Sequence, residues 1–96
     1  MTTRDEILKV LKEIKPLLSD KYKVSKIGLF GSYSRDEADA DSDIDILVEI
    51  EPKFSYLIEI ESLLENRLHH KVDIVRLHTN LRERFKNRIL QEVIYA

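Results

Sequence analysis

The residues best suited to chemistry are two aspartates, Asp43 and Asp45, which follow the dipeptide Gly31-Ser32 after ten intervening residues. Carboxylates two positions apart on an extended strand leave the same face, where they repel each other unless a cation joins them. Mg²⁺ prefers hard oxygen ligands and commonly takes one or two carboxylates together with substrate phosphates. Asp43 and Asp45 therefore predict a divalent-metal site that acts on phosphates.

Gly31 and Ser32 have the properties of a phosphate-binding turn. A glycine at a strand end lets the backbone approach a phosphate closely, and the N-terminus of a following helix offers N–H groups to an anion. The hydroxyl of Ser32 adds a donor, and the guanidinium of Arg35, about one turn further on, could reach a triphosphate. We expect this side of the site to hold the triphosphate and the carboxylate side to hold the metal.

A third carboxylate, Asp73, interrupts an apolar run that includes Val72 and Ile74. Because those two neighbours would face a core, strand alternation predicts that Asp73 lies on the same face as Asp43 and Asp45. Three carboxylates can complete a site for two metal ions about 3.5–4 Å apart, which clamp the attacking and leaving oxygens of a phosphoryl displacement.

Three segments carry apolar residues at helical spacing and predict helices, namely residues 3–18, 54–68 and 80–94. The first and last begin with capping boxes, Thr3 with Glu6 and Asn80 with Glu83. Pro16 removes a backbone donor and predicts a kink in the last turn of the first helix. The apolar faces expected for the first two helices contain Ile7, Leu8, Leu11, Ile14, Leu17, Leu18, Phe54, Leu57, Ile58, Leu64 and Leu68.

Short apolar or alternating runs predict strands over residues 24–30, 43–50 and 71–77, and residues 33–38 are expected to form a short helix. Helices and strands therefore alternate along the chain. The layering that buries their apolar surfaces is an α/β (α+β) fold, in which helices pack on one face of a small three-stranded mixed sheet.

Length and composition limit the classes of function. The 96 residues, 43% hydrophobic and 35% charged, suit a single globular domain over residues 1–96. The absence of cysteine excludes disulfides, thiolate zinc sites and cysteine nucleophiles. No apolar run reaches the length of a membrane span and no signal-peptide core is present, so we expect a cytoplasmic protein without membrane contact.

Charge is small in total but unevenly distributed. The net charge of −2 argues against direct nucleic-acid binding. Residues 36–51 contain eight acids and no Lys or Arg, whereas residues 76–88 contain five Lys or Arg and one acid. The acidic centre suits cations, and the basic stretch is either a solvated face or a surface for phosphates or an acidic partner.

The stretch from Gly31 to Val48, G-S-Y-S-R-D-E-A-D-A-D-S-D-I-D-I-L-V, resembles the motif of the minimal nucleotidyltransferases of the DNA polymerase β superfamily. The resemblance extends to Val72-Asp73-Ile74 and to the terminal L-R-E-R-F…I-L-Q-E-V-I-Y, so it covers essentially the whole chain. It implies the palm fold of polymerase β and assigns roles to the candidate residues. The implied catalytic metal ligands are Asp43, Asp45 and Asp73, and the implied nucleotide-binding residues are Gly31, Ser32 and Arg35.

The same resemblance implies a reaction and a partner. The expected activity is transfer of AMP from ATP, with two Mg²⁺ ions or with Mn²⁺, to a tyrosine hydroxyl of a HEPN-domain ribonuclease toxin. The chain would be the antitoxin and would form a hetero-oligomer with that toxin. One residue departs from the pattern, because Asp36 stands where a glycine usually follows the arginine. The acid there either weakens triphosphate binding or faces solvent.

Two other functions are compatible with the residues. The chain could be a binding module that neutralises a partner by docking, with a vestigial nucleotide site. It could also be a small-molecule nucleotidyltransferase, although relatives of that kind usually carry an extra domain for the acceptor.

Overall fold

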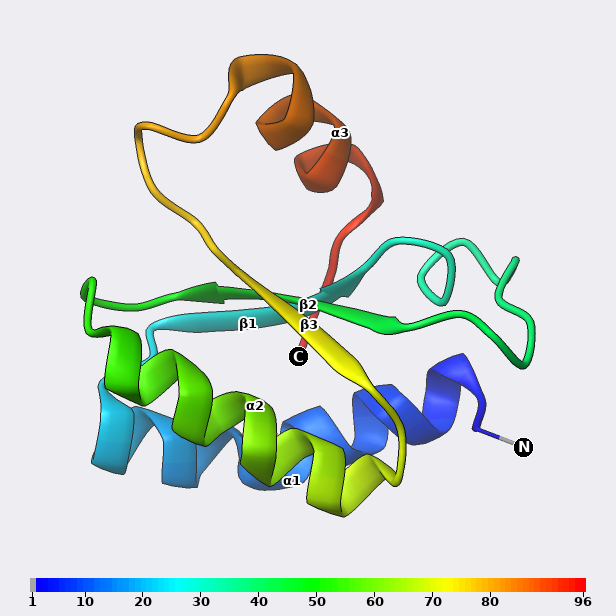
Figure 1. The fold of residues 1–96 in the computed structure, drawn as a ribbon, viewed down its shortest axis with the longest axis horizontal. Helices are drawn as coiled ribbons and strands as arrows, with labels where there is room; N and C mark the ends of the chain where they lie inside the picture. The colour runs from blue at the N-terminus through cyan, green and yellow to red at the C-terminus, as the bar shows by residue number, and fades with distance from the viewer. Residues whose placement is uncertain (1) are drawn as a thin grey trace.

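The computed structural model describes residues 2–96, which form a four-stranded mixed sheet with three helices (Figure 1). The strands are β1 (Lys26–Phe30), β2 (Ile44–Glu49), β3 (Val72–Arg76) and β4 (Ile94–Tyr95), in the order β3-β2-β1-β4. β1 pairs antiparallel with β2 and with β4, whereas β2 and β3 run parallel. The predicted mixed sheet and its three strands are confirmed, and the fourth strand was not predicted.

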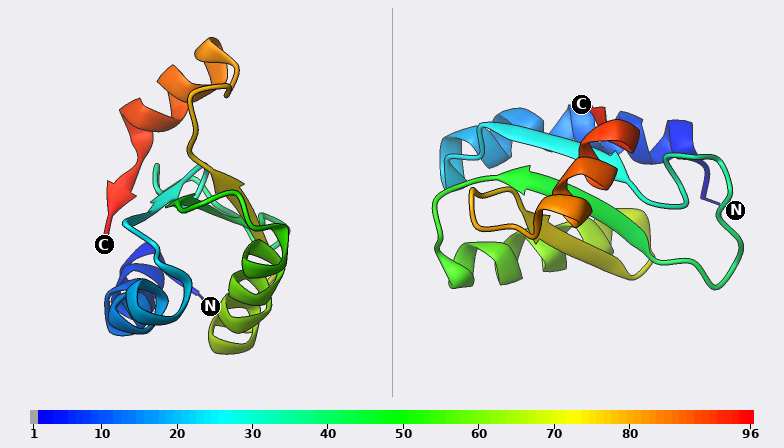
Figure 2. Two further views of the ribbon diagram at one scale, coloured as in Figure 1. Left: turned by 90° about the vertical axis from the view of Figure 1, so that its left-hand side faces the viewer. Right: turned by 90° about the horizontal axis from the view of Figure 1, so that it is seen from above.

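Helices α1 (Arg4–Tyr22) and α2 (Phe54–Leu68) cover one face of the sheet, as Figures 1 and 2 show. Alternate strand residues face these helices because successive side chains leave opposite faces. They form one core with a stripe from each helix, made of Ile7, Leu11, Leu18, Ile27, Leu29, Ile44, Ile46, Val48, Ile60, Leu64 and Val72. The N-cap bond of the predicted capping box is confirmed, because the hydroxyl of Thr3 accepts a hydrogen bond from the Glu6 N–H at 3.2 Å.

Several details of the two helices differ from the prediction. α1 continues through Pro16 for six further residues, to Tyr22. Leu17, Phe54 and Ile58 were expected on apolar faces, but they are 48%, 76% and 53% exposed. The cause is that each helix presents one stripe to the sheet, and in α2 the stripe is Ile60-Leu64-Leu68. Phe54 and Ile58 therefore project from another side of α2.

Helix α3 (Glu83–Glu92) lies on the opposite face of the sheet and crosses the strands (Figures 1 and 2). The predicted packing of helices on one face of the sheet is therefore correct for α1 and α2 and wrong for α3. Ile89 anchors α3 in a second, smaller apolar cluster with Phe30 and Leu47. Those two strand residues belong to the same face as Asp45, so α3 covers the face that carries the candidate carboxylates.

The last helix begins and ends differently from the prediction. Arg82 is its N-cap and makes no side-chain capping bond, so the expected capping box of Asn80 with Glu83 is absent. The helix stops at Glu92, and Ile94–Tyr95 pairs with β1 instead of continuing the helix. Gly28 permits this pairing, because a Cβ there would lie 2.7 Å from Cγ2 of Val93.

No helix within residues 2–96 is long and apolar enough to cross a membrane.

Gly28→Ala should lower the free energy of unfolding by about 1–3 kcal/mol, because the added methyl group overpacks the contact between β1 and Val93. Urea unfolding would measure the change. In a Val93→Ala background the same substitution should cost less, because the nearest carbon atom is gone. An equal cost in both backgrounds would show that this contact is not what excludes a side chain at position 28.

Candidate active site

A pocket of about 450 Å³ lies between the sheet and α3. Its lining is partly polar and partly apolar. The polar residues are Gly31, Ser32, Arg35, Asp45, Asp73, Arg88 and Glu92, and the apolar residues are Phe30, Val75, Phe85 and Ile89. Residues from three strands, one turn and one helix therefore meet here, and five of the six predicted site residues are among them.

Asp45 and Asp73 are partners across the parallel pairing of β2 with β3. Their neighbours Ile44, Ile46 and Val72 are fully buried against α1 and α2, which leaves both carboxylates on the α3 side of the sheet. The expectation that the two aspartates share a face is confirmed.

Asp43 is placed differently. It precedes β2, it does not line the pocket, and its Oδ2 lies 3.7 Å from Nζ of Lys71. Within the part of the chain that the structure describes, no three His, Cys, Asp or Glu side chains are close enough together to hold one metal ion. The expected cluster of three carboxylates is therefore not assembled in this structure: Asp45 and Asp73 face the pocket, and Asp43 faces Lys71.

The electrostatics of Asp45 nevertheless suit a cation. Burial, together with the negative charges of Asp73, Asp43 and Glu92, raises the pKa of Asp45 to about 6. A hard-oxygen pair with this excess of negative charge is the donor set that Mg²⁺ or Mn²⁺ takes. The residues present fit such an ion, which Asp45 and Asp73 would hold from adjacent strands.

Gly31 packs directly against the carboxylate of Asp45. Its φ is +77°, and a Cβ at this position would lie 2.1 Å from Oδ2 of Asp45. Both observations exclude a side chain here, because L residues rarely adopt this backbone and the carboxylate already fills the space. The glycine therefore places the backbone of the turn against the carboxylate pair.

Residues 33–38 do not form the expected short helix: residues 32–36 form turns, and residues 37–38 have no regular structure. The N–H groups of Ser34 and Arg35 both donate to the carbonyl of Gly31, at 3.1 and 3.3 Å, and the Ser34 hydroxyl donates to the same carbonyl at 2.7 Å. The chain closes on itself around Gly31 in a single turn. The helix macrodipole expected behind Ser32 is therefore absent, and the donors that this turn offers to an anion come from Ser32 and Arg35.

The backbone conformation of Asp36 explains why a glycine would suit this position. Its φ is +60°, a left-handed conformation that favours glycine and tolerates Asp. Its side chain is exposed and lines a different depression, with Thr3 and Tyr33. The acid therefore does not line the pocket of Asp45.

Arg35 does line the pocket, but two carboxylates hold it. Its Nε donates to Glu37 at 3.1 Å and its Nη1 donates to Glu92. Glu92 was not predicted as a site residue. The packing of Ile89 on the sheet brings the end of α3, and with it Glu92, to the pocket. Its spacing of four from Arg88 could have indicated an ion pair but not the pocket.

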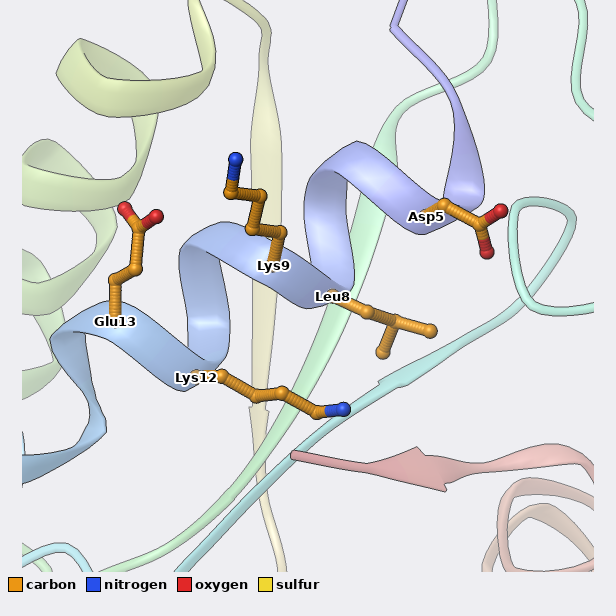
Figure 3. Close-up of a pocket in the computed structure, with 5 residues that line it drawn as sticks. All are labelled: Asp5, Leu8, Lys9, Lys12 and Glu13. Atoms are coloured by element: carbon orange, nitrogen blue, oxygen red, sulfur yellow. The ribbon is translucent and has the colours of Figure 1, made fainter.

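A second depression of about 500 Å³ runs along α1 (Figure 3). Its lining residues are Asp5, Leu8, Lys9, Lys12 and Glu13. They carry both signs of charge, and α1 lies on the other face of the sheet from Asp45. We therefore assign the candidate site to the pocket under α3.

Gly31→Ala should lower the free energy of unfolding by about 1–2 kcal/mol through the left-handed backbone alone, and the clash with Asp45 should add to that. Asp36→Gly is the matched reverse change and should raise stability by about 0.5 kcal/mol, because it relieves the same strain without a clash. Chemical unfolding compares the two. A neutral Gly31→Ala variant would contradict the packing described.

The raised pKa of Asp45 predicts a pH-dependent stability in metal-free buffer. The folded pKa of about 6 exceeds the reference value of 3.8, so folding favours the protonated carboxyl of Asp45. The free energy of unfolding gained in this way is fully present below about pH 4 and is lost as the pH rises through 6. With allowance for solvent screening, Asp45→Asn should be more stable than wild type by about 1 kcal/mol at pH 7.5 in EDTA. The difference should close by about pH 4 in urea unfolding, and Asp41→Asn, an exposed acid, should show no such trend.

Comparisons with known proteins agree with this geometry. Residues 12–96 match the family described as "Polymerase beta, Nucleotidyltransferase". The chain is 41% identical over 98 residues to the protein adenylyltransferase MntA of Thermococcus cleftensis. The alignment covers 100% of this chain and 98% of that protein.

Two solved structures are similar throughout most of the chain. One is a toxin–antitoxin crystal structure with AMP-PNP, with a TM-score of 0.71, 29% identity, and coverage of 88% of this chain and 69% of that one. The other contains a tri-AMPylated Shewanella oneidensis HEPN toxin in complex with an MNT antitoxin, with a TM-score of 0.65, 25% identity, and coverage of 97% and 71%. The sheet, the turn at Gly31 and the extent of these matches lead to one assignment: the chain belongs to the minimal nucleotidyltransferases of the DNA polymerase β superfamily.

Proposed function

We propose that the chain is a metal-dependent protein adenylyltransferase that transfers AMP from ATP to a tyrosine hydroxyl of a HEPN-type ribonuclease toxin, and so acts as its antitoxin. The observation that carries the proposal is the register pair of Asp45 and Asp73 beneath Gly31, in one pocket with Ser32 and Arg35. The pocket offers charged side chains for phosphates and apolar side chains for a base or an aromatic acceptor.

The relatives support the choice of reaction. The Thermococcus cleftensis protein, 41% identical, is named a protein adenylyltransferase, and the similar Shewanella oneidensis complex contains an AMPylated toxin. The AMP-PNP of the other complex supports ATP as the donor nucleotide. These names describe the relatives, and the extent of the matches together with the pocket residues of this chain is the reason to extend them to it.

The reaction assigns a task to each side chain. The acceptor oxygen forms a bond to the α-phosphorus of ATP, the bond from that phosphorus to the oxygen of the β-phosphate breaks, and pyrophosphate leaves. The hydroxyl proton passes to a pocket carboxylate, for which the exposed Asp73 is the better placed. Ser32 and Arg35 orient the phosphates and offset the charge that develops on the leaving group.

A divalent ion would be held by Asp45 and Asp73, with Asp43 able to join them by leaving Lys71. Such an ion supplies charge neutralisation and a more acidic acceptor hydroxyl. The proposal therefore includes two carboxylates that already face the pocket and a third that must turn towards it.

The decisive experiment is co-expression of the chain with a candidate HEPN-type partner, followed by incubation with labelled ATP and mass spectrometry of that partner. Wild type with Mg²⁺ or Mn²⁺ should add AMP to a tyrosine. Asp45→Asn and Asp73→Asn should lower the rate at least 100-fold, because the charge-stabilising ligands are lost. EDTA should have the same effect.

Asp41→Asn is the matched control, because this exposed acid lies outside the pocket and should leave transfer unchanged. Neutralisation of the partner by Asp45→Asn without AMP transfer would favour the docking module. Label on a small molecule instead of a protein would favour a small-molecule nucleotidyltransferase. Either result would overturn the proposal.

A further inference from the structure

Glu92, the last residue of α3, carries a carboxylate in the pocket that the motifs do not explain. Its side chain is only 12% exposed, and each of its oxygens faces a different arginine. Oε2 accepts a hydrogen bond from Nη1 of Arg35, and Oε1 lies 3.6 Å from Nε of Arg88. All three side chains line the pocket that also contains Asp45 and Asp73.

The two arginines are accessible from the pocket and able to change partner. Arg35 is 34% exposed and Arg88 is 69% exposed at the side chain. With Gln91 and Glu92 they also line a neighbouring depression of about 420 Å³. The three charged groups therefore form a wall between two open spaces, and a ligand can reach both guanidinium groups without displacing the core.

A guanidinium group binds carboxylates and phosphates with the same fork of N–H donors. A phosphate carries more charge than a carboxylate and offers more acceptor oxygens, so it can replace a carboxylate on an arginine. Glu92 presents its two oxygens to two arginines within a pocket that already holds two other acids. A third acid at this place weakens anion binding unless the arginines leave it.

We propose that Glu92 is an internal surrogate for a nucleotide phosphate: it holds Arg35 and Arg88 at the pocket wall in the nucleotide-free protein, and the phosphates must displace it to bind. The inference rests on the proposed function, because it takes a nucleotide triphosphate as the ligand. Glu92 therefore lowers nucleotide affinity, since each binding event must first break its ion pairs.

Glu37 provides a contrast on the same arginine. It accepts from Nε of Arg35 at 3.1 Å, but its side chain is 66% exposed and does not line the pocket. Solvent screens such a pair and makes it weak. The competition with a phosphate should therefore depend on Glu92 and hardly on Glu37.

The test is isothermal titration of the whole chain with ATP plus Mg²⁺, and with tripolyphosphate in EDTA. Glu92→Gln should bind both ligands about five- to tenfold more tightly than wild type, which is the range of a moderate coupling between sites. Glu92→Asp, with a shorter reach, should show an intermediate gain. Two controls should change affinity less than twofold. Glu37→Gln removes an exposed charge beside Arg35, and Glu83→Gln removes an exposed charge from α3, the helix of Glu92.

The gain must depend on the arginine if the mechanism is right. In an Arg35→Gln background, Glu92→Gln should give less than half of its gain, whereas a purely structural role of Glu92 would be independent of Arg35. Unchanged or weaker binding in folded Glu92→Gln and Glu92→Asp would overturn the inference and leave the proposed function intact. Absence of ATP binding to wild type itself would overturn both.

Discussion

The contact between Gly31 and the carboxylate of Asp45 is the constraint on which the site depends. β1 must be followed by a left-handed residue without a side chain, because the Asp45 carboxylate fills the space of a Cβ at position 31. That requirement sets the path of the following turn, which closes on the carbonyl of Gly31 and carries Ser32 and Arg35 towards the pocket. The turn that we propose to bind phosphate and the proposed metal ligand are thus joined by direct packing of backbone on side chain.

The carboxylate pair works against the stability of the fold. Asp45 and Asp73 face each other across β2 and β3, and their repulsion adds to the effect of burial on the pKa of Asp45. The apolar packing of the opposite face, where α1 and α2 cover the sheet, offsets this repulsion. The sheet therefore separates two tasks, with cohesion on the face of α1 and α2 and charge on the face of α3.

Local patterns of residues were enough to predict much of this arrangement. Alternation along residues 43–50 and 71–77 correctly placed Asp45 and Asp73 on one face, and helical periodicity gave α2 its observed bounds. Features that depend on tertiary packing could not be predicted in this way. The pairing of β4 depends on the absence of a side chain at Gly28, on a strand that is far away in the sequence. Glu92 reaches the pocket because Ile89 packs on Phe30 and Leu47. The pairing of Asp43 with Lys71 likewise joins the starts of two strands.

The parallel pairing of β2 with β3 also has a consequence for the order of folding. These strands are joined by a long crossover that contains α2, and closing such a connection is slow. The register that completes the crossover also brings two like charges together, so electrostatic repulsion opposes the last step of sheet formation. A divalent cation held by the two carboxylates would lower that repulsion. The ion that we propose for this site would then also assist the folding of the carboxylate pair that holds it.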